Sequence, residues 1–426
     1  MDVFILIILI LLILISFFKP IVGLYLFIFV AYIRPQDFYP FLVEIEPVKW
    51  IMLTCFISFL FHKFNSREKF VGAKQNWGIL GILLSILISR ISAIDAAKWS
   101  QATQDFIVIC MAYFLIINLL NTTKKLRNFY LFFVFINLII ALRSFISYKT
   151  GTAVYYGGKP GDLSLGFFAN PDNLGLGMAV ALAYSIVPIC YGENVLIKGI
   201  FSIISGCIMV SALATDSRGA YIGIFTVFII AVISQLRLRK ILNRKFFIGL
   251  LMVLLLFTVF AYKFRFALKN SYDSISNEED TGRIGRMATW TAAQLMIRDN
   301  LIFGVGRGNF VAYWEGHYPP GVYGYQVAHN IIYEVTAETG IIGLLFYLYF
   351  SLYGLIELKK LNKYIKKNTV KTYYPEMIFT IYLVGLFAFY VSGMFITVAY
   401  YLHIYVLVAL FVSAKNIFMK QVAYAK

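Results

Sequence analysis

Charged residues are scarce in this sequence: Asp, Glu, Lys and Arg together make up 14% of its 426 residues, against about 25% in typical soluble domains. Hydrophobic residues make up 60%, and the mean hydropathy is +0.78. This composition excludes an ordinary soluble domain. The short alternating segments of a transmembrane β-barrel are also missing, so helices are left as the way to cross a membrane.

Cysteine and histidine are scarce too, with four of each. No cysteine belongs to a Cys-x-x-Cys pair or lies at ligand spacing from a histidine, which argues against a disulfide framework or a thiolate metal site. The chain also lacks an Asp-x-Asp motif, an internal repeat and a low-complexity segment. We therefore expect no cofactor and no bound metal. Packing explains the cysteines, which are Cys55, Cys110, Cys190 and Cys207.

Long apolar stretches recur from one end of the chain to the other. Because a helix needs about 20 apolar residues to cross the hydrocarbon core, they predict an all-α, polytopic transmembrane bundle of 12 or 13 helices. The number depends on Pro20, since the first two stretches form either a hairpin or one kinked helix. The predicted spans are residues 2–17, 20–33, 50–62, 77–91, 105–121, 128–147, 173–191, 196–214, 219–236, 246–262, 328–356, 376–395 and 397–414.

Lysine and arginine are concentrated in the connections 63–76, 122–128, 237–245 and 357–371. If the spans alternate, all four connections lie on one side of the membrane, and the positive-inside rule makes that side cytoplasmic. The net charge of +17 is then a topology signal, and no nucleic acid partner is needed to explain it.

The largest segment on the opposite, outer face covers residues 263–327. It divides the chain into amino-terminal helices (1–262), this outer segment, and carboxy-terminal helices (328–426). Loops of this length are usually functional or disordered. Here the aromatic residues and a helical pattern from Gly285 to Arg298 predict an ordered segment.

Two arginines stand out near the outer face. Arg218 lies at the mouth of a predicted span, where an arginine is costly unless it meets an anion or water; the alternative is an arginine that anchors the helix end. Arg286 lies one helical turn before Trp290, on the same predicted helix face. Guanidinium groups bind phosphate oxygens in a bidentate manner. Arg286 is a better candidate than Arg283, which a solvated position explains equally well.

Three alternating glycines, Gly304, Gly306 and Gly308, surround Arg307. The stretch lacks the Lys-Ser/Thr ending and the preceding buried strand of a phosphate-binding loop. It therefore predicts a tight turn after a helix. Arg307 within that turn is a secondary candidate for contact with an anion.

His329 and Asn330 open the predicted span that carries Glu334 and Glu338. Histidine suits proton transfer near neutral pH. The helix dipole at this position disfavours the imidazolium form and so favours a neutral base; the alternative is a histidine that caps or packs the helix. The two glutamates share one helical face and need partners such as arginine or water.

In chain order the features are an outer Ser-Arg-Gly, an Arg-x3-Trp, a Gly-x-Gly-x-Gly-Asn-Phe turn, and a His-Asn that opens a span with Glu-Thr-Gly. This order resembles the O-antigen ligase and polymerase superfamily of bacterial envelope enzymes over residues 215–345. The stretch from Ala31 to Asp37 also resembles the ligase-like branch associated with exosortase systems. The resemblance implies a GT-C-like membrane fold.

The resemblance further implies a glycosyltransferase of the bacterial cytoplasmic (inner) membrane with its active site facing the periplasm. Its donor would be a glycan on undecaprenyl diphosphate, and its acceptor a hydroxyl group on lipid A–core or a protein. Carried over by position, Arg218 and Arg286 bind the diphosphate and His329 serves the acceptor hydroxyl. The secondary candidates are Arg283, Arg307, Trp290 and Glu338.

Two alternatives remain open. A polymerase would join repeat units on the lipid carrier and would carry the same motifs. A transporter or flippase for lipid-linked glycans would place its charges near the bilayer midplane and would often consist of two related halves. The candidate arginines and histidine of this chain lie near the predicted outer face instead, and the sequence shows no two related halves.

We predict that transfer inverts the anomeric centre and needs no metal ion, because fixed arginines stabilise the departing diphosphate and the chain lacks an Asp-x-Asp motif. The purified protein should keep full transferase activity after exhaustive chelation. Loss of activity followed by rescue with one specific divalent ion would contradict this prediction.

Overall fold

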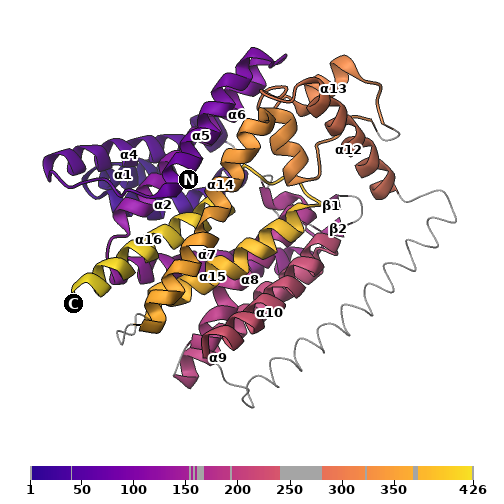
Figure 1. Ribbon diagram of the computed structural model, residues 1–426. Coiled ribbons are helices and arrows are strands. Elements are labelled where there is room, and N and C mark those ends of the chain that lie inside the picture. The colour runs from indigo at the N-terminus through magenta and orange to yellow at the C-terminus, as the bar shows by residue number, and fades with distance from the viewer. Residues whose placement is uncertain are drawn as a thin grey trace.

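The computed structural model describes residues 2–39, 41–152, 155–156, 159–160, 167–191, 194–239, 281–321, 324–367 and 373–424. Within these residues the regular structure is almost entirely helical (Figure 1). The one pair of strands described is short and antiparallel, and consists of β1 (Tyr155–Tyr156) and β2 (Lys159–Pro160). The predicted all-α fold is confirmed.

The helices begin at ordinary sequence signals. Proline occupies the first position of α2 and of α4, and the side chains of Asp95 and Thr122 accept backbone N–H groups at the starts of α6 and α7. The helices are α1 (Asp2–Phe18), α2 (Pro20–Ile33), η1 (Pro35–Asp37), α3 (Phe41–Ile45), α4 (Pro47–Asn65), α5 (Lys74–Ile88), η2 (Ser89–Ile91), α6 (Ala96–Leu119), α7 (Thr123–Thr150), η3 (Phe167–Ala169), α8 (Pro171–Tyr191), α9 (Val195–Ala214), α10 (Arg218–Arg239), α12 (Thr281–Asp299), α13 (Phe310–His317), α14 (Ile331–Lys367), α15 (Tyr373–Gly393) and α16 (Leu402–Tyr424).

Seven of the described helices are long and apolar enough to cross a membrane: α6, α7, α8, α9, α14, α15 and α16. Every predicted span except 246–262 overlaps a helix, which confirms the polytopic bundle. The span 246–262 and the beginning of the outer segment, 263–280, lie outside the described residues, so the total of 12 or 13 stays a prediction. At Lys19 the backbone leaves the helical region (φ −133°, ψ 86°), and α1 and α2 are therefore two helices rather than one.

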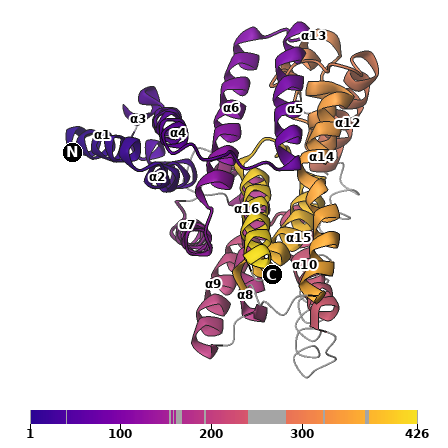
Figure 2. The ribbon, with the colours of Figure 1, turned by 60° about the vertical axis from the view of Figure 1, so that its left-hand side comes forward.

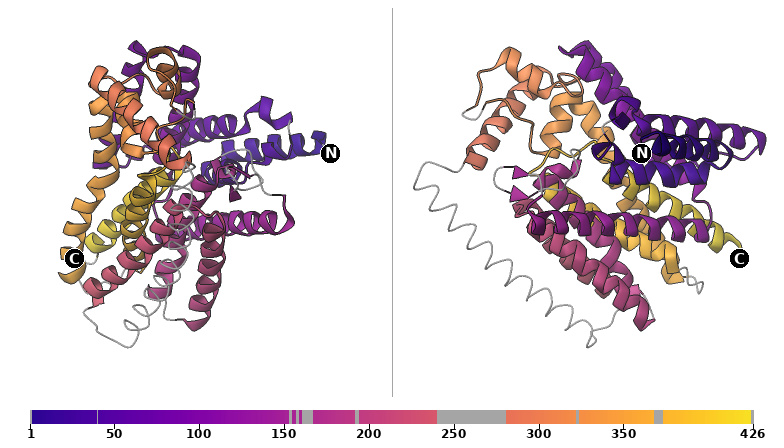
Figure 3. Two further views of the ribbon diagram at one scale, coloured as in Figure 1. Left: turned by 90° about the vertical axis from the view of Figure 1, so that its right-hand side faces the viewer. Right: turned by 180° about the vertical axis from the view of Figure 1, so that it is seen from behind.

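Helices α8, α15 and α16 form the centre of the bundle. Between 72% and 78% of the most apolar part of each is buried, against 28% for α9 at the periphery. Glycine in α8 allows close packing: a Cβ atom at Gly175 would lie 2.7 Å from the Cβ of Ala220 in α10. The amino-terminal helices α1, α2 and α4 form a separate group beside α6 (Figures 2 and 3).

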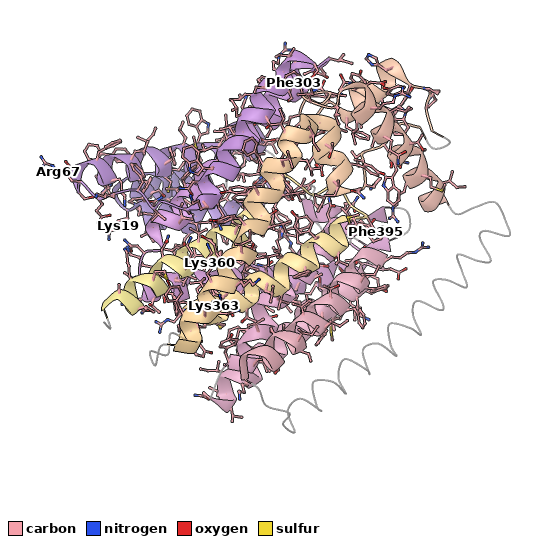
Figure 4. All side chains as sticks on the ribbon, in the orientation of Figure 1. Lys19, Arg67, Phe303, Lys360, Lys363 and Phe395 are labelled. Carbon is pink, nitrogen blue, oxygen red and sulfur yellow. The ribbon has the colours of Figure 1, made fainter. Side chains whose placement is uncertain are left out.

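The outer segment contains α12 and α13 and has its own apolar cluster, which includes Met296 and Trp314. Helix α12 confirms the predicted helical pattern from Gly285 to Arg298. Figure 4 shows Phe303, from the turn between α12 and α13, at the top of the molecule and the basic residues Lys360 and Lys363 well below it. The described part of this segment, from Thr281 on, is thus ordered, and the side of the membrane on which it lies stays a prediction.

Helix α14 is broken at Gly340, which has φ 70° and ψ −177°. The predicted span 328–356 is thus a short helix followed by a long one, and not a continuous helix. The turn between α12 and α13 provides hydrogen-bond partners for backbone groups on both sides of the break. Before the break, the carbonyls of Ala337 and Glu338 accept the N–H groups of Val305 (2.8 Å) and Gly306 (3.0 Å). After the break, the N–H group of Ile341 donates to the carbonyl of Leu301 (2.8 Å).

The predicted tight turn is confirmed at the three alternating glycines. Gly304, Gly306 and Gly308 have φ values of 69°, 101° and 75°, a region that side chains with a Cβ atom rarely enter. A Cβ atom at Gly304 would also lie 2.5 Å from the backbone nitrogen of Thr339. The glycines therefore let this turn lie directly on the broken part of α14.

We predict that Gly340→Ala lowers the thermal unfolding midpoint of the detergent-purified protein. A methyl group there would collide with the carbonyl of Ile302, and the backbone conformation alone costs about 1–3 kcal/mol for a residue other than glycine. Gly206→Ala in α9 is the matched control, because no atom lies within 4 Å of its added Cβ; it should keep or raise the midpoint. Equal midpoints for the two variants would contradict the prediction.

Candidate functional site

The start of α8 places a carboxylate next to the outer segment. The side chain of Asn170 accepts the N–H groups of Asp172 (2.9 Å) and Asn173 (3.4 Å), and Pro171 occupies the first helical position. An acidic residue in the first turn is stabilised by the positive end of the helix dipole. The helix start thereby holds the Asp172 side chain in a half-buried position.

Arg286 projects from α12 towards this carboxylate. Its Nη2 lies 3.5 Å from Oδ2 of Asp172, with 27% of the arginine side chain and 23% of the aspartate side chain exposed. Helix α12 is fixed here because Thr289 donates a hydrogen bond to the carbonyl of Ala328 (3.5 Å). The distance and the partial exposure describe a loose ion pair, which a stronger anion can open.

His329 lies in the connection that leads into α14. Its backbone has φ 47°, and its N–H group donates to the hydroxyl of Thr397 (2.8 Å). Asn330 follows as the helix cap: its side-chain oxygen accepts the N–H group of Ile332 (2.8 Å), and its amide donates to the carbonyl of Met394 (3.1 Å). The imidazole is thus carried on a backbone anchored to the segment after α15.

The electrostatic surroundings of His329 favour a neutral imidazole. Burial, together with the positive charge of Arg286, lowers the pKa of His329 below its ordinary value of 6.5, and Asp172 opposes this shift. The direction agrees with the neutral base expected from the sequence. The main cause is burial, whereas the expectation rested on the helix dipole.

Arg218 begins α10 and is exposed. The carbonyl of its neighbour Gly219 accepts a hydrogen bond from Ser392 (2.9 Å). Ser392 lies in the last turn of α15, just before the segment that holds His329 through Thr397 and Asn330 through Met394. One short stretch of chain, residues 392–397, therefore contacts both the Arg218 helix and the His329 connection.

Arg307 and Glu338 form a second, tighter ion pair. Nη1 of Arg307 lies 2.6 Å from Oε2 of Glu338, and the guanidinium carbon lies 3.8 Å from the centroid of the Tyr400 ring. Glu334, one turn before Glu338, accepts the backbone N–H group of Ala399 (3.0 Å). The two glutamates thus have the partners that a membrane-spanning helix requires, and Arg307 is already neutralised by a carboxylate.

The remaining candidates differ in what the structure describes. Trp290 packs near Tyr333, with ring centroids 6.1 Å apart, and within the described part of the chain its indole N–H group has no acceptor. The side chain of Arg283 lies outside the described residues. No cluster of three or more His, Cys, Asp or Glu side chains with metal-binding geometry occurs in the described part of the chain.

Asp172 and Thr397 did not emerge from the sequence as site residues. The stretch Asn170-Pro171-Asp172 has the composition of a helix start. The position of the Asp172 carboxylate in a first helical turn could therefore have been predicted from the sequence. Its pairing with Arg286, more than 100 positions later, had no sequence signal. The hydroxyl of Thr397 likewise acquires its role only through folding.

Two separate regions of the chain match known protein families. Residues 201–348 match a family model described as O-Antigen ligase. Residues 1–191 match a model described as a family of unknown function, DUF5935. No curated protein matches the chain. The first match contains Arg218, Arg286 and His329, whereas Asp172 belongs to the second.

We predict opposite shifts of the His329 pKa in two variants. Asp172→Asn removes the charge that raises it, so the pKa should fall further, and Arg286→Gln removes a charge that lowers it, so the pKa should rise. Titration of ¹³C-labelled histidine by NMR measures both shifts, and a His329→Gln spectrum assigns the resonance. Shifts of the same sign in both variants would contradict the arrangement described here.

Proposed function

We propose, on the premise that residues 201–348 match the O-antigen ligase family, that this chain transfers a preassembled glycan from undecaprenyl diphosphate to an envelope acceptor. The family implies a membrane glycosyltransferase of the ligase or polymerase type, with a lipid-linked glycan and an acceptor as substrates. The acceptor in our proposal is a hydroxyl group of lipid A–core or of a protein. The observation that carries the proposal is the convergence of His329, Arg286 and Asp172 at the ends of three helices.

The donor diphosphate is proposed to bind at Arg286 and Arg218. A diphosphate carries more negative charge than one carboxylate and offers several oxygens to a guanidinium group. It can therefore replace Asp172 at Arg286, whose pair is open at 3.5 Å. Trp290, one turn along α12 from Arg286, remains a secondary candidate in this proposal. Charge accumulates on the diphosphate as the bond to the sugar breaks, so these donors stabilise the transition state more than the bound donor.

The acceptor hydroxyl is proposed to be activated by His329. The neutral imidazole takes the hydroxyl proton while the acceptor oxygen attacks the anomeric carbon. The bond between that carbon and the diphosphate oxygen breaks, and the diphosphate departs with the electron pair. One bond forms as one breaks, on opposite faces of the sugar, so the configuration inverts. The lowered pKa of His329 favours the neutral imidazole, which is the form that accepts the proton.

A polymerase would use the same donor chemistry with a second lipid-linked unit as acceptor. The description of the matched family favours the ligase. The products separate the two: a ligase detaches the whole glycan from its carrier, whereas a polymerase leaves a longer glycan attached to the carrier. A transporter would move the donor across proteoliposomes without chemical turnover.

We predict that His329→Ala reduces the rate of transfer by about 100- to 10,000-fold, the range usual for loss of a general base, while donor binding persists. Transfer is measured with purified protein and lipid-linked glycan, and binding with the donor alone. An undiminished transfer rate in a folded His329→Ala protein would overturn the assignment of the base.

We predict that Arg286→Ala and Arg218→Ala each weaken donor binding by about 10-fold or more, the effect expected for loss of a hydrogen bond to a charged group. Arg298→Ala is the matched control, because this arginine also lies on α12 but exposes 71% of its side chain and pairs with Asp299. Equal affinities of the control and the Arg286 variant would exclude diphosphate binding at Arg286.

A further inference from the structure

A cavity of about 740 Å³ lies beside the candidate site. This volume falls within the range of about 300–1,000 Å³ that is usual for small-molecule sites. One wall comes from α2, α3, α4, α6 and the turn around η1, and the other comes from Arg307 and residues after it. Arg34 and Gln36, from the Arg-Pro-Gln-Asp stretch that has no part in the transfer step, belong to the first wall.

The positive charges in the walls are already paired. Arg34 binds Asp37 through two nitrogen–oxygen contacts of 2.8 and 3.1 Å. Lys49 lies 2.8 Å from Glu46. Arg307 is held by Glu338, as described above. A diphosphate would have to break such pairs, and the tight Arg307 pair is largely buried, so the cavity is poorly suited to the charged part of the donor.

The walls instead offer acceptor oxygens and aromatic rings. Glu334 is 4% exposed and accepts the backbone N–H group of Ala399, and Asp105, which is exposed, accepts the side-chain amide of Gln101 (3.2 Å). Each carboxylate has room for further donors. Tyr401 and Phe310 add ring surfaces. A lipid tail would offer these oxygens no further donors, which is costly at the buried Glu334, whereas hydroxyl groups supply both donors and acceptors.

The cavity lies against the connection that carries His329. Ala328 and Thr397 line it, and Thr397 accepts the N–H group of His329. Asp172 and Arg286 are not among its lining residues. The cavity and the Arg286–Asp172 pair therefore both lie next to the connection that carries His329, although His329 itself does not line the cavity.

We propose that this cavity binds a neutral, hydroxyl-rich sugar segment of one of the two substrates. The role in transfer rests on the proposed function, but the binding itself does not. The segment comes from either the acceptor glycan or the donor glycan, which share this chemistry. The amino-terminal region matched only by a family of unknown function then has a task, since it forms half of the sugar site.

Saturation-transfer NMR on the full chain in nanodiscs tests the binding. The probes are neutral trisaccharides of glucose, galactose, mannose and N-acetylglucosamine. At least one should receive saturation from the wild-type protein, and Val48→Trp, which fills the cavity, should reduce the effect at least fivefold. Val195→Trp is the matched control, because Val195 is 81% exposed on α9, and it should bind as the wild type does.

Asp105→Ala provides a second variant that removes a carboxylate from the wall without adding bulk, and it should also weaken binding. Absence of saturation for all four trisaccharides, or equal binding by the control and both cavity variants, would overturn the proposal. Saturation of a serine- and threonine-rich decapeptide in place of the sugars would also overturn it and would indicate a peptide site.

Transfer kinetics identify the source of the sugar. If the acceptor occupies the cavity, Val48→Trp raises the KM for the acceptor at least fivefold and leaves the KM for the donor unchanged. If the donor glycan occupies the cavity, the variant raises the KM for the donor at least fivefold and leaves the KM for the acceptor unchanged. Unchanged KM values for both substrates would contradict the proposal. These results are independent of the His329 and Arg286 variants, which test the chemistry rather than the sugar site.

Discussion

The break in α14 at Gly340 is the constraint on which the rest of the site depends. A helix that stops within a membrane protein exposes carbonyl and N–H groups, which are tolerated only where protein or water satisfies them. Here the turn between α12 and α13 supplies the missing partners. The same turn carries Arg307 to Glu338. The break makes the first part of α14 short. His329 and Asn330, which immediately precede this part, therefore lie close to the outer segment and to residues 392–397.

The two arginine–carboxylate pairs of this region serve different purposes. The Arg307–Glu338 pair is short, at 2.6 Å, with the carboxylate 6% exposed, and an uncompensated charge in such surroundings is strongly destabilising. The Arg286–Asp172 pair is longer and about a quarter of each side chain is exposed, so water compensates either charge when the pair opens. The tight pair stabilises the fold, and the loose pair leaves an arginine that can exchange its partner.

The helices could be predicted from the sequence because hydropathy is a local property, and each predicted span among the described residues overlaps a helix. The glycine turn was also predictable, because a stretch with three alternating glycines favours a tight turn. The break at Gly340 was not, because Glu-Thr-Gly inside an apolar stretch is compatible with a continuous helix, and only contact with the turn makes the break stable. The pairing of Arg286 with Asp172 depends on how α8 and α12 are placed in space. The candidate arginines and histidine were therefore named from the sequence, and their roles stay a prediction, whereas their partners could not be named.

The position of Asp172 has a consequence for how such chains can vary. It lies in the region matched by one family, whereas its partner Arg286 lies in the region matched by another. The cavity walls divide in the same way, with Arg34 on one side and Arg307 on the other. A hybrid that joins the first region of one relative to the second region of another would thus inherit half of an ion pair and half of a binding surface. The two regions are separate as sequence families, but the proposed site needs both halves to be matched to each other.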